Sequence, residues 1–256
     1  MMINLTSRSN PVCFHIRKLG RNRSYREEHK QFICDGIKLL IEAINSDIKI
    51  DVILTSEHLS LELPKGVRVF HVTQDILESV SPLTTSQKII FSCAFKDESP
   101  SDYRKNTHIL LDCIQDPGNV GTIIRCAHAF GVESVIFTGS TADIYSPKTI
   151  RATMGAIFKQ KISFLKTPEL FALKDAGVRF ICASNGENAA DINSADLSNS
   201  IIMMGNEGRG ISKELFGLYD STVKIPITND CESINVASAA AIFMWEAMKG
   251  GKLCHH

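Results

Sequence analysis

Three short blocks in the second half of this chain combine glycine-opened backbone with side chains that could do chemistry. The first block carries Asn119 and Arg125, the second runs from Gly205 to Gly210 around Glu207, and the third carries Asn235. Amide and carboxylate groups can orient a hydroxyl, and the planar donors of arginine can hold a phosphate or a developing alkoxide. Each block joins an expected strand end to a helix start. Together they have the composition of a binding or catalytic site.

Each block also has an ordinary structural explanation. The glycines around Glu207 permit a tight turn or a close backbone approach, and Ser212 is a fair N-cap for a helix after them. Asn119 can cap the helix that carries Arg125, and an arginine on such a helix is often salt-bridged. No Gly-Lys-Ser/Thr sequence follows the glycines, and the dinucleotide fingerprint Gly-x-Gly-x-x-Gly after a first strand is missing. Nucleoside triphosphates and NAD are therefore disfavoured as ligands.

The second half of the chain alternates expected strands and helices. The strands are strongly apolar, so both faces of their sheet should be covered. This pattern predicts a mostly parallel sheet with helices on both faces, and ligands bind such sheets at the carboxyl ends of the strands, where all three blocks fall. The expected strands span 108–114, 134–139, 161–165, 178–184, 200–205 and 222–227, and helices are expected after 119, over 149–158, after 212 and over 234–249.

The first half predicts a smaller α/β unit. A helix is expected over residues 25–45, where apolar residues recur at helical spacing, and β-rich runs follow it. Residues 96–107 have no apolar periodicity and are expected to form a linker. The β-rich runs span 50–56, 67–73 and 88–95, and the expected parts of the chain are a first domain over 1–95, the linker over 96–107 and a second domain over 108–256.

Charge is segregated along the chain, although the formal net charge is zero. The N-terminal arm up to Lys30 is strongly basic, and the remainder is acidic by the same excess. Such an arm is either an electrostatic footprint for nucleic acid or a solvated helix face. Its basic residues are Arg8, Arg17, Lys18, Arg21, Arg23, Arg26 and Lys30.

The eight cysteines are scattered, form no Cys-x-x-Cys pair and mostly lie inside apolar runs. Reduced core cysteines in the cytoplasm explain this pattern best. No stretch approaches the ~20 apolar residues of a membrane-spanning helix, so no membrane partner is expected. The terminal pair His255 and His256 is more typical of a cloning remnant or a frayed tail than of a metal site.

In their order, the three blocks resemble the SpoU (TrmH-type) branch of the SPOUT superfamily, RNA 2′-O-ribose methyltransferases that use S-adenosylmethionine. The first motif of that family is an asparagine followed six residues later by an arginine. Any one motif alone would be weak, but three in the correct order are specific. The first motif matches Asn119 and Arg125, the second matches Gly205, Glu207 and Gly208, and the third matches Ile225, Pro226, Ser233, Ile234 and Asn235.

Two further segments extend the resemblance to nearly the whole chain. Residues 146–158 are similar to the family's segment between the first two motifs, with Arg151 at the position of an RNA-facing arginine. Residues 32–44 resemble a small substrate-recognition domain whose fold is shared with some ribosomal proteins. Asp35 stands where a glutamate is usual in that domain. This departure leaves open which RNA element the domain recognises.

The resemblance implies a fold, a cofactor and a partner. It implies a deep trefoil knot in the C-terminal domain, S-adenosylmethionine bound through backbone groups, a homodimer with both active sites near the interface, and no metal. The implied catalytic residues are Arg125, Asn119, Glu207 and Asn235; the implied cofactor-binding residues are Gly205, Ile225, Ile234, Asn206, Pro226 and Ser233; and the implied RNA-binding residue is Arg151. The charge of the N-terminal arm adds Arg17, Lys18, Arg21, Arg23 and Arg26 as candidate RNA-binding residues.

The implied reaction is methyl transfer to a ribose 2′-hydroxyl in structured RNA. The separate recognition domain favours ribosomal RNA as the substrate, and the family members that act on it include enzymes that confer antibiotic resistance. Transfer RNA is the alternative substrate. The family view makes Arg125 the proton acceptor, but guanidinium is effectively always protonated in proteins, so stabilising the alkoxide or holding the adjacent phosphate is the other possible role. A catalytically silent RNA-binding protein is disfavoured because all the catalytic residues are present. A nucleotide-dependent oxidoreductase is disfavoured by the missing fingerprint.

Overall fold

The computed structural model describes residues 2–83, 87–96, 101–228 and 230–249, and the chain forms two compact units. Unit 1 comprises Met1–Asp97 and Asp143–Lys159, and unit 2 comprises Glu98–Ala142 and Gln160–His256. Residues 143–159, which the sequence placed in the second domain, therefore pack with the first unit. Of the predicted linker, residues 97–100 lie outside the described residues, as does the terminal histidine pair.

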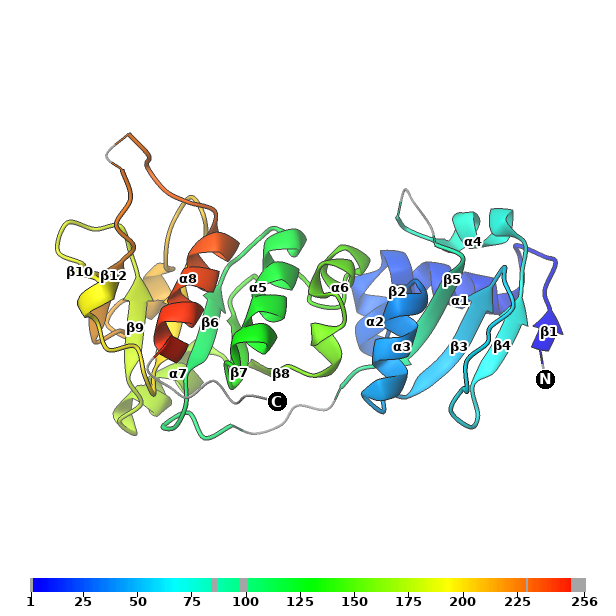
Figure 1. Cartoon of the computed structure of the whole chain (residues 1–256), viewed down its shortest axis with the longest axis horizontal. Coiled ribbons are helices and arrows are strands. Elements are labelled where there is room, and N and C mark those ends of the chain that lie inside the picture. The colour runs from blue at the N-terminus through cyan, green and yellow to red at the C-terminus, as the bar shows by residue number, and fades with distance from the viewer. Residues whose placement is uncertain (1, 84–86, 97–100, 229, 250–256) are drawn as a thin grey trace. The chain divides into compact units, whose positions relative to one another are not determined.

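Unit 1 is built on a five-stranded mixed sheet (Figure 1). Its strands lie in the order β1, β4, β3, β5, β2, and the pairs β1–β4 and β4–β3 are parallel while β3–β5 and β5–β2 are antiparallel. The core of the unit gathers apolar residues of this sheet with buried residues of helices α1 and α4. The strands are β1 (Met2–Asn4), β2 (Gln31–Asp35), β3 (Ile50–Thr55), β4 (Arg68–His71) and β5 (Ile89–Ala94).

The helix expected over residues 25–45 is wrong, because a buried strand interrupts it. Lys30 adopts a left-handed conformation, with φ of 50°, and ends helix α2 (Arg23–His29); β2 follows. Gly36 then turns the chain at φ of 107°, where an added Cβ would lie 1.9 Å from Gln87 Oε1. A short apolar run is compatible with either a helix or a strand. Here its pairing with β5 makes it a strand. The helices are α1 (Pro11–Arg21), α2 (Arg23–His29), α3 (Ile37–Asn45), α4 (Gln74–Val80), α6 (Pro147–Thr153) and the short 3-10 helix η1 (Ala156–Phe158).

Unit 2 contains a seven-stranded sheet in which every pairing between named strands is parallel. All residues of its strands β6, β7 and β11 are buried. The predicted mostly parallel sheet is therefore confirmed. In sheet order the strands are β10 (Ala190–Asp191), β12 (Ser221–Lys224), β9 (Phe180–Ala183), β11 (Ile201–Met204), β6 (His108–Asp112), β7 (Ser134–Thr138) and β8 (Lys161–Phe164).

Helices cover both faces of this sheet. Leu170 of α7 packs in one cluster with Leu110 and Met203 of the strands. Neighbouring strand residues point to the opposite face, and there α5 contacts β7 while α8 contacts β11. Helices α5 and α8 lie side by side (Figure 1). The helices are α5 (Pro117–Phe130), α7 (Thr167–Asp175) and α8 (Val236–Lys249), with short 3-10 turns η2 (Ile192–Ser194) and η3 (Lys213–Leu215).

Two local expectations in unit 2 need correction. Asp116, not Asn119, caps α5: its side chain accepts from the Asn119 backbone N–H, so Asn119 lies inside the first turn. Only the 3-10 turn η3 follows Ser212, in place of a helix. In the part of the chain that the structure describes, no helix is both long and apolar enough to span a membrane.

Candidate active site

All three sequence blocks follow carboxyl ends of strands in the parallel sheet of unit 2. Asn119 comes after β6, Gly205 directly after β11, and Ile225 directly after β12. Strands β6 and β11 are hydrogen-bonded neighbours, and β9 lies between β11 and β12. Since the strands are parallel, these ends share one edge of the sheet, which is the edge where such sheets bind ligands.

A hydrogen-bonded network joins one side chain from each block. Asn119 Nδ2 donates to Glu207 Oε1 at 2.9 Å, and Asn235 Nδ2 donates to Asn119 Oδ1 at 3.0 Å. Asn235 also accepts from the backbone N–H groups of Ala237 and Ser238, so it caps the start of α8. The structure therefore brings together Asn119, Glu207 and Asn235, three of the residues predicted to be catalytic.

The glycine-rich block closes on itself. Asn206 and Gly210 exchange two backbone hydrogen bonds of 2.9 Å, and a Cβ at Gly205 would lie 2.3 Å from the Gly210 carbonyl carbon. The Asn206 side chain accepts from the Gly208 and Arg209 N–H groups and donates to the Cys113 carbonyl. The side chain of Asn206 thus holds the loop itself. Gly205 is required by the closure of this loop, which agrees with the tight turn that the glycines permit.

Asp112 and Cys113, which the sequence analysis did not single out, hold the two ends of this loop. Asp112 is 1% exposed, and its Oδ2 accepts from the Ser212 N–H at 2.6 Å. Cys113 has φ of 58°, a left-handed conformation uncommon for a residue with a side chain. Its carbonyl accepts from Asn206 Nδ2 at 3.0 Å, and burial raises the pKa of its thiol. The available sequence signal was an aspartate directly after the apolar run Ile109–Leu111, just before the first block.

Arg125 is not part of the network. Six residues at 3.6 per turn place it about 120° around α5 from Asn119. Its side chain is exposed, and within the described ranges no hydrogen bond or ion pair involves its guanidinium. The ordinary explanation, a salt-bridged helix arginine, therefore does not apply. The structure leaves these donors available to a ligand or a partner.

The third block forms an irregular segment. Residues 225–228 and 230–235 belong to neither helix nor strand. Ile225 and Ile234 are half-buried, whereas Pro226 and Ser233 are exposed. Asn185 Nδ2 donates to the Glu232 carbonyl at 3.1 Å and supports this segment from outside. The segment presents peptide groups and two apolar side chains at the same edge as the network.

The basic residues predicted to contact RNA differ in availability. Lys18 lies over the Phe14 ring at 5.5 Å, and Arg21 is exposed, with no hydrogen bond or ion pair in the described part of the chain. Arg17 donates to the Ser79 and Arg8 carbonyls. Arg23 forms an exposed ion pair with Glu27 on the same helix. Lys18 and Arg21 are therefore the most accessible cations of this group.

Arg26, which was predicted to contact RNA, is buried and bonded within unit 1. It is 5% exposed, and its guanidinium is bonded to Asp143 and to the Leu19 carbonyl. A guanidinium that is buried and bonded on both sides is not available to a phosphate. This ion pair could not be predicted from the sequence, because Asp143 lies 117 positions away from Arg26.

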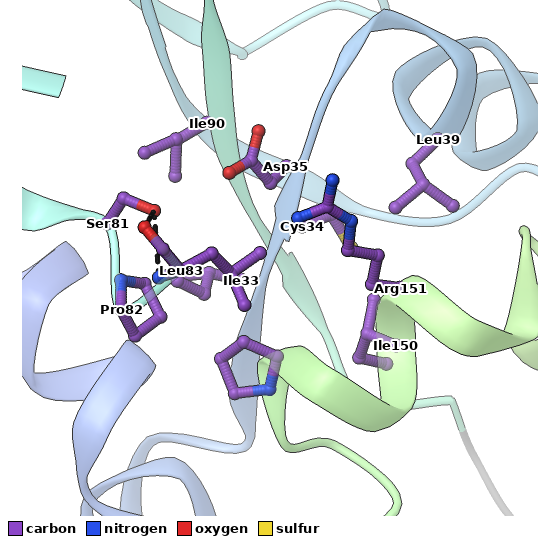
Figure 2. Close-up of a pocket in the computed structure, with 11 residues that line it drawn as sticks. Ile33, Cys34, Asp35, Leu39, Ser81, Pro82, Leu83, Ile90, Ile150 and Arg151 are labelled. Atoms are coloured by element: carbon purple, nitrogen blue, oxygen red, sulfur yellow. Dashed lines mark hydrogen bonds between the residues drawn. The ribbon is translucent and has the colours of Figure 1, made fainter. Parts of the chain in front are cut away.

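Arg151 lines a small pocket inside unit 1. Figure 2 shows it reaching from α6 toward the strand that carries Cys34 and Asp35. Burial raises the pKa of the Asp35 carboxyl, opposed by the Gln87 N–H bond and by the charge of Arg151. Among the described residues, no hydrogen bond reaches the buried Asp35 Oδ2. Within the described residues, no group of three His, Cys, Asp or Glu side chains could hold a metal ion.

Comparison with known proteins gives relatives along nearly the whole chain. The 23S rRNA (guanosine(2553)-2′-O)-methyltransferase RlmP of Bacillus subtilis is 31% identical over 86% of this chain and 89% of its own length. A 23S rRNA (uridine(2479)-2′-O)-methyltransferase of Streptomyces viridochromogenes is 32% identical over 55% of this chain and 52% of its own. The crystal structure of an AdoMet-bound rRNA methyltransferase from Sinorhizobium meliloti superposes with a TM-score of 0.85 at 28% identity, covering 97% of this chain and 98% of that one.

Two family models divide the chain between them. The MRM3-like substrate binding domain matches residues 10–90, within unit 1. The model of the SpoU rRNA methylase family matches residues 106–245, which include all three blocks of the candidate site. With this match, and with a relative of 31% identity along most of its length, the chain belongs to the SpoU rRNA methylase family.

Proposed function

We propose that this protein transfers a methyl group from S-adenosylmethionine to a ribose 2′-hydroxyl in ribosomal RNA. The observation that carries the proposal is the hydrogen-bonded network of Asn119, Glu207 and Asn235 at the carboxyl edge of the sheet. The names of the relatives support the substrate class, because two of them methylate ribose in 23S rRNA. A transfer RNA substrate is the second candidate, supported by other relatives described as tRNA/rRNA methyltransferases.

The residues at the sheet edge fit S-adenosylmethionine. The irregular segments 225–228 and 230–235 leave peptide groups for the polar atoms of adenosine, and the half-buried side chains of Ile225 and Ile234 suit the flat adenine ring. At Gly210 an added Cβ would meet nothing within 4 Å, so the loop is open on that side. In this proposal Gly205, Pro226 and Ser233 shape the loops through their backbone, and Asn206 does so through its side chain as well.

The site residues divide the reaction between them. Bound S-adenosylmethionine supplies a methyl group on a sulfonium already activated for displacement. Asn119, Glu207 and Asn235 hold one another in a fixed arrangement and orient the 2′-hydroxyl in line with the bond that breaks. Arg125 stabilises the negative charge that develops on the hydroxyl oxygen or grips the neighbouring phosphate. These are the roles we assign to the four catalytic residues.

Unit 1 is the RNA-binding part in this proposal. Its accessible cations Lys18 and Arg21, together with Arg17, Arg23 and Arg151, suit the phosphate contacts that position a protein on folded RNA. Residues 1–95 and the inserted segment 143–159 would recognise RNA, and residues 96–107 would link the two units. The rest of residues 108–256 would carry the catalytic domain with its trefoil knot. A reducing, cytoplasmic location agrees with the free cysteines of the described ranges.

A homodimer completes the proposal. Helices α5 and α8 pack together and expose Ile242 (39%) and Trp245 (46%), and the Trp245 ring contacts Phe130 at 5.9 Å. An exposed apolar face of this kind is typical of an interface. Arg125 lies on α5 as well, and in this proposal its guanidinium faces the partner copy.

The test is a map of ribose methylation in cells with and without this protein. The expected result is loss of one 2′-O-methyl group from ribosomal RNA, restored by the wild-type gene and not by a gene encoding Arg125→Ala. Loss of a methyl group from transfer RNA alone would select the second candidate. Identical maps, with no binding of S-adenosylmethionine by calorimetry, would contradict the proposed activity.

A further inference from the structure

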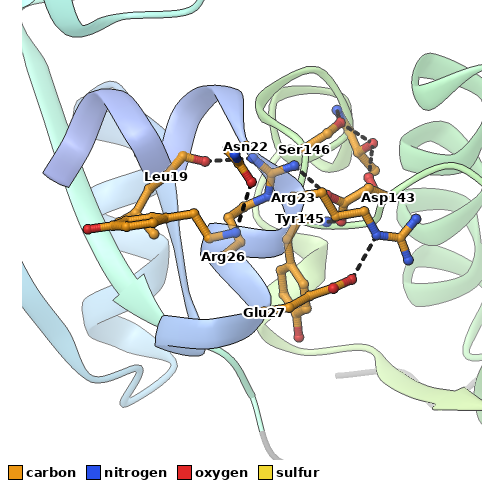
Figure 3. Close-up of polar contacts among 10 residues, drawn as sticks. Leu19, Asn22, Arg23, Arg26, Glu27, Asp143, Tyr145 and Ser146 are labelled. Carbon is orange, nitrogen blue, oxygen red and sulfur yellow. Dashed lines mark hydrogen bonds and ion pairs between the residues drawn. The ribbon is translucent and has the colours of Figure 1, made fainter. Parts of the chain in front are cut away.

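An ion pair between the buried Arg26 and the half-buried Asp143 fastens the inserted segment 143–159 to the rest of unit 1. Arg26 of α2 donates from Nη2 and Nε to Asp143 Oδ2, with the Nε bond at 3.1 Å, and from Nη1 to the Leu19 carbonyl at 2.6 Å (Figure 3). Asp143 is also part of the local turn, because its Oδ1 accepts from the Tyr145 N–H at 2.8 Å. Both groups of the pair are therefore committed to several bonds at once.

A buried ion pair seldom adds much stability, because removing both charges from water costs about as much as their attraction returns. Its better attested effect is to select one arrangement among several. The fork of an arginine binds in a fixed plane, so Arg26 fixes the position of Asp143 relative to α1 and α2. This makes orientation, more than stability, the expected contribution of the pair.

Other contacts hold the remainder of the segment to unit 1. The Tyr145 ring stacks on Phe95 at 3.9 Å and lies 4.8 Å from Phe32. Near the end of the segment, Lys159 forms an ion pair of 2.7 Å with Glu42 of α3. The segment, which carries Arg151 on α6, is therefore attached to unit 1 at its beginning and at its end, and between them α6 contacts β2.

The residues that flank this segment are anchored in unit 2. The Ala142 N–H donates to the Ile114 carbonyl at 2.8 Å, and the Gln160 side chain donates to the Val132 carbonyl at 3.0 Å. Ile114 precedes by two residues Asp116, which caps the helix of Asn119. Asp143 is thus separated by one peptide bond from a residue tied to the turn that leads into the candidate active site.

We propose that Arg26 is a positioning residue for methyl transfer, acting through Asp143 on the segment 143–159. The inference rests on the proposed function. Arg26 holds the segment so that Arg151 meets RNA in one orientation. RNA use therefore depends on Arg26, although Arg26 touches neither RNA nor S-adenosylmethionine.

The test compares full-length variants that remove the pair from either side. Arg26→Gln and Asp143→Asn each break it, and Asp143→Asn keeps an oxygen for the Tyr145 N–H. Arg68→Gln is the matched control, because it breaks an ion pair of the same unit, with Asp51, that is exposed. The measurements are amide hydrogen exchange of residues 143–159, affinity for S-adenosylmethionine, and kcat/KM for RNA.

We expect faster exchange in 143–159 with unchanged exchange in β3, affinity for S-adenosylmethionine within about twofold of wild type, and kcat/KM for RNA at least about tenfold lower. The double variant should lose no more than either single one. A double variant that loses the product of both effects, normal methylation by Arg26→Gln, or unchanged exchange in 143–159 would each overturn the inference. A uniform fall in stability, with exchange raised everywhere and affinity for S-adenosylmethionine lost in parallel, would also overturn it. If wild type methylates no RNA, the proposed function fails, while the exchange data still decide whether Arg26 holds the segment.

Discussion

The hydrogen bond from Asn235 to Asn119, 3.0 Å long, has a direction that the backbone of α8 determines. Two backbone N–H groups donate to Asn235 Oδ1, so this atom must be the amide oxygen and Nδ2 must face Asn119. Asn119 then presents its oxygen to Asn235 and its Nδ2 to Glu207. The cap of α8 therefore determines the orientation of both asparagine amides, and through them the donor that faces the Glu207 carboxylate.

The substitution Asn235→Asp distinguishes the capping role of Asn235 from its role in the hydrogen-bonded network. Aspartate caps helices as well as asparagine does, so the melting temperature should stay within about 2 °C of wild type. The introduced carboxylate would have no donor for Asn119, whose amide would turn and present its oxygen to Glu207. We expect methyl transfer to fall about tenfold or more, measured as kcat with saturating RNA. Asn235→Ala, which loses cap and network together, is the comparison, and unchanged kcat in the Asn235→Asp variant would show that the network has no catalytic role.

Arg125→Ala should abolish methyl transfer and leave the fold and the cofactor site intact. The reason is that Arg125 is exposed and, among the described residues, has no bonded partner to lose. Surface substitutions of this kind change stability by about 0.5 kcal/mol or less. Calorimetry with S-adenosylmethionine and a methyl-transfer assay are the measurements. A loss of cofactor affinity as large as the loss of rate would contradict the assigned role.

The sheet of unit 2 could be predicted from the sequence because its strands are continuous apolar runs, a pattern that only burial on both faces explains. The strand β2 could not be predicted, because the apolar run within residues 31–35 is too short to distinguish a helix from a strand. Its pairing with β5, far along the chain, makes it a strand. The same limit applies to Asp143, whose local sequence gives no sign that it belongs to unit 1.

The candidate site shows the same division. Asn119, Glu207 and Asn235 could be predicted to meet because all three follow strand ends on one edge. Their catalytic roles stay a prediction. Arg26 was assigned to RNA from charge alone, and its burial depends on an acid 117 positions away. The positive φ of Cys113 was equally hidden, because cysteine carries no local preference for that conformation.

Gly205→Ala should disturb the loop, whereas Gly208→Ala should not. A Cβ at Gly205 would lie 2.3 Å from Gly210 carbon and 2.4 Å from Ile211 nitrogen, both backbone atoms that cannot move alone. At Gly208 the nearest atom would be Asn206 Oδ1 at 3.8 Å. We expect Gly205→Ala to lose about 1–3 kcal/mol of stability, as overpacked sites do, and at least about tenfold in affinity for S-adenosylmethionine. Equal behaviour of the two variants in denaturant unfolding and calorimetry would refute this account of the loop.

Trp245→Asp should convert a dimer into a monomer. The substitution places a charge in the centre of the exposed face of α5 and α8, and an unpaired charge in an apolar interface is costly. Phe216→Asp is the matched control, because Phe216 is 59% exposed in the same unit and lies outside these helices. Sedimentation should give a dimer for wild type and Phe216→Asp and a monomer for Trp245→Asp, with all three folded by circular dichroism. If Arg125 acts across the interface, the monomer should also lose methyl transfer while it still binds S-adenosylmethionine. A Trp245→Asp variant that remains a dimer would place the interface elsewhere. A monomeric wild type would contradict the proposed homodimer.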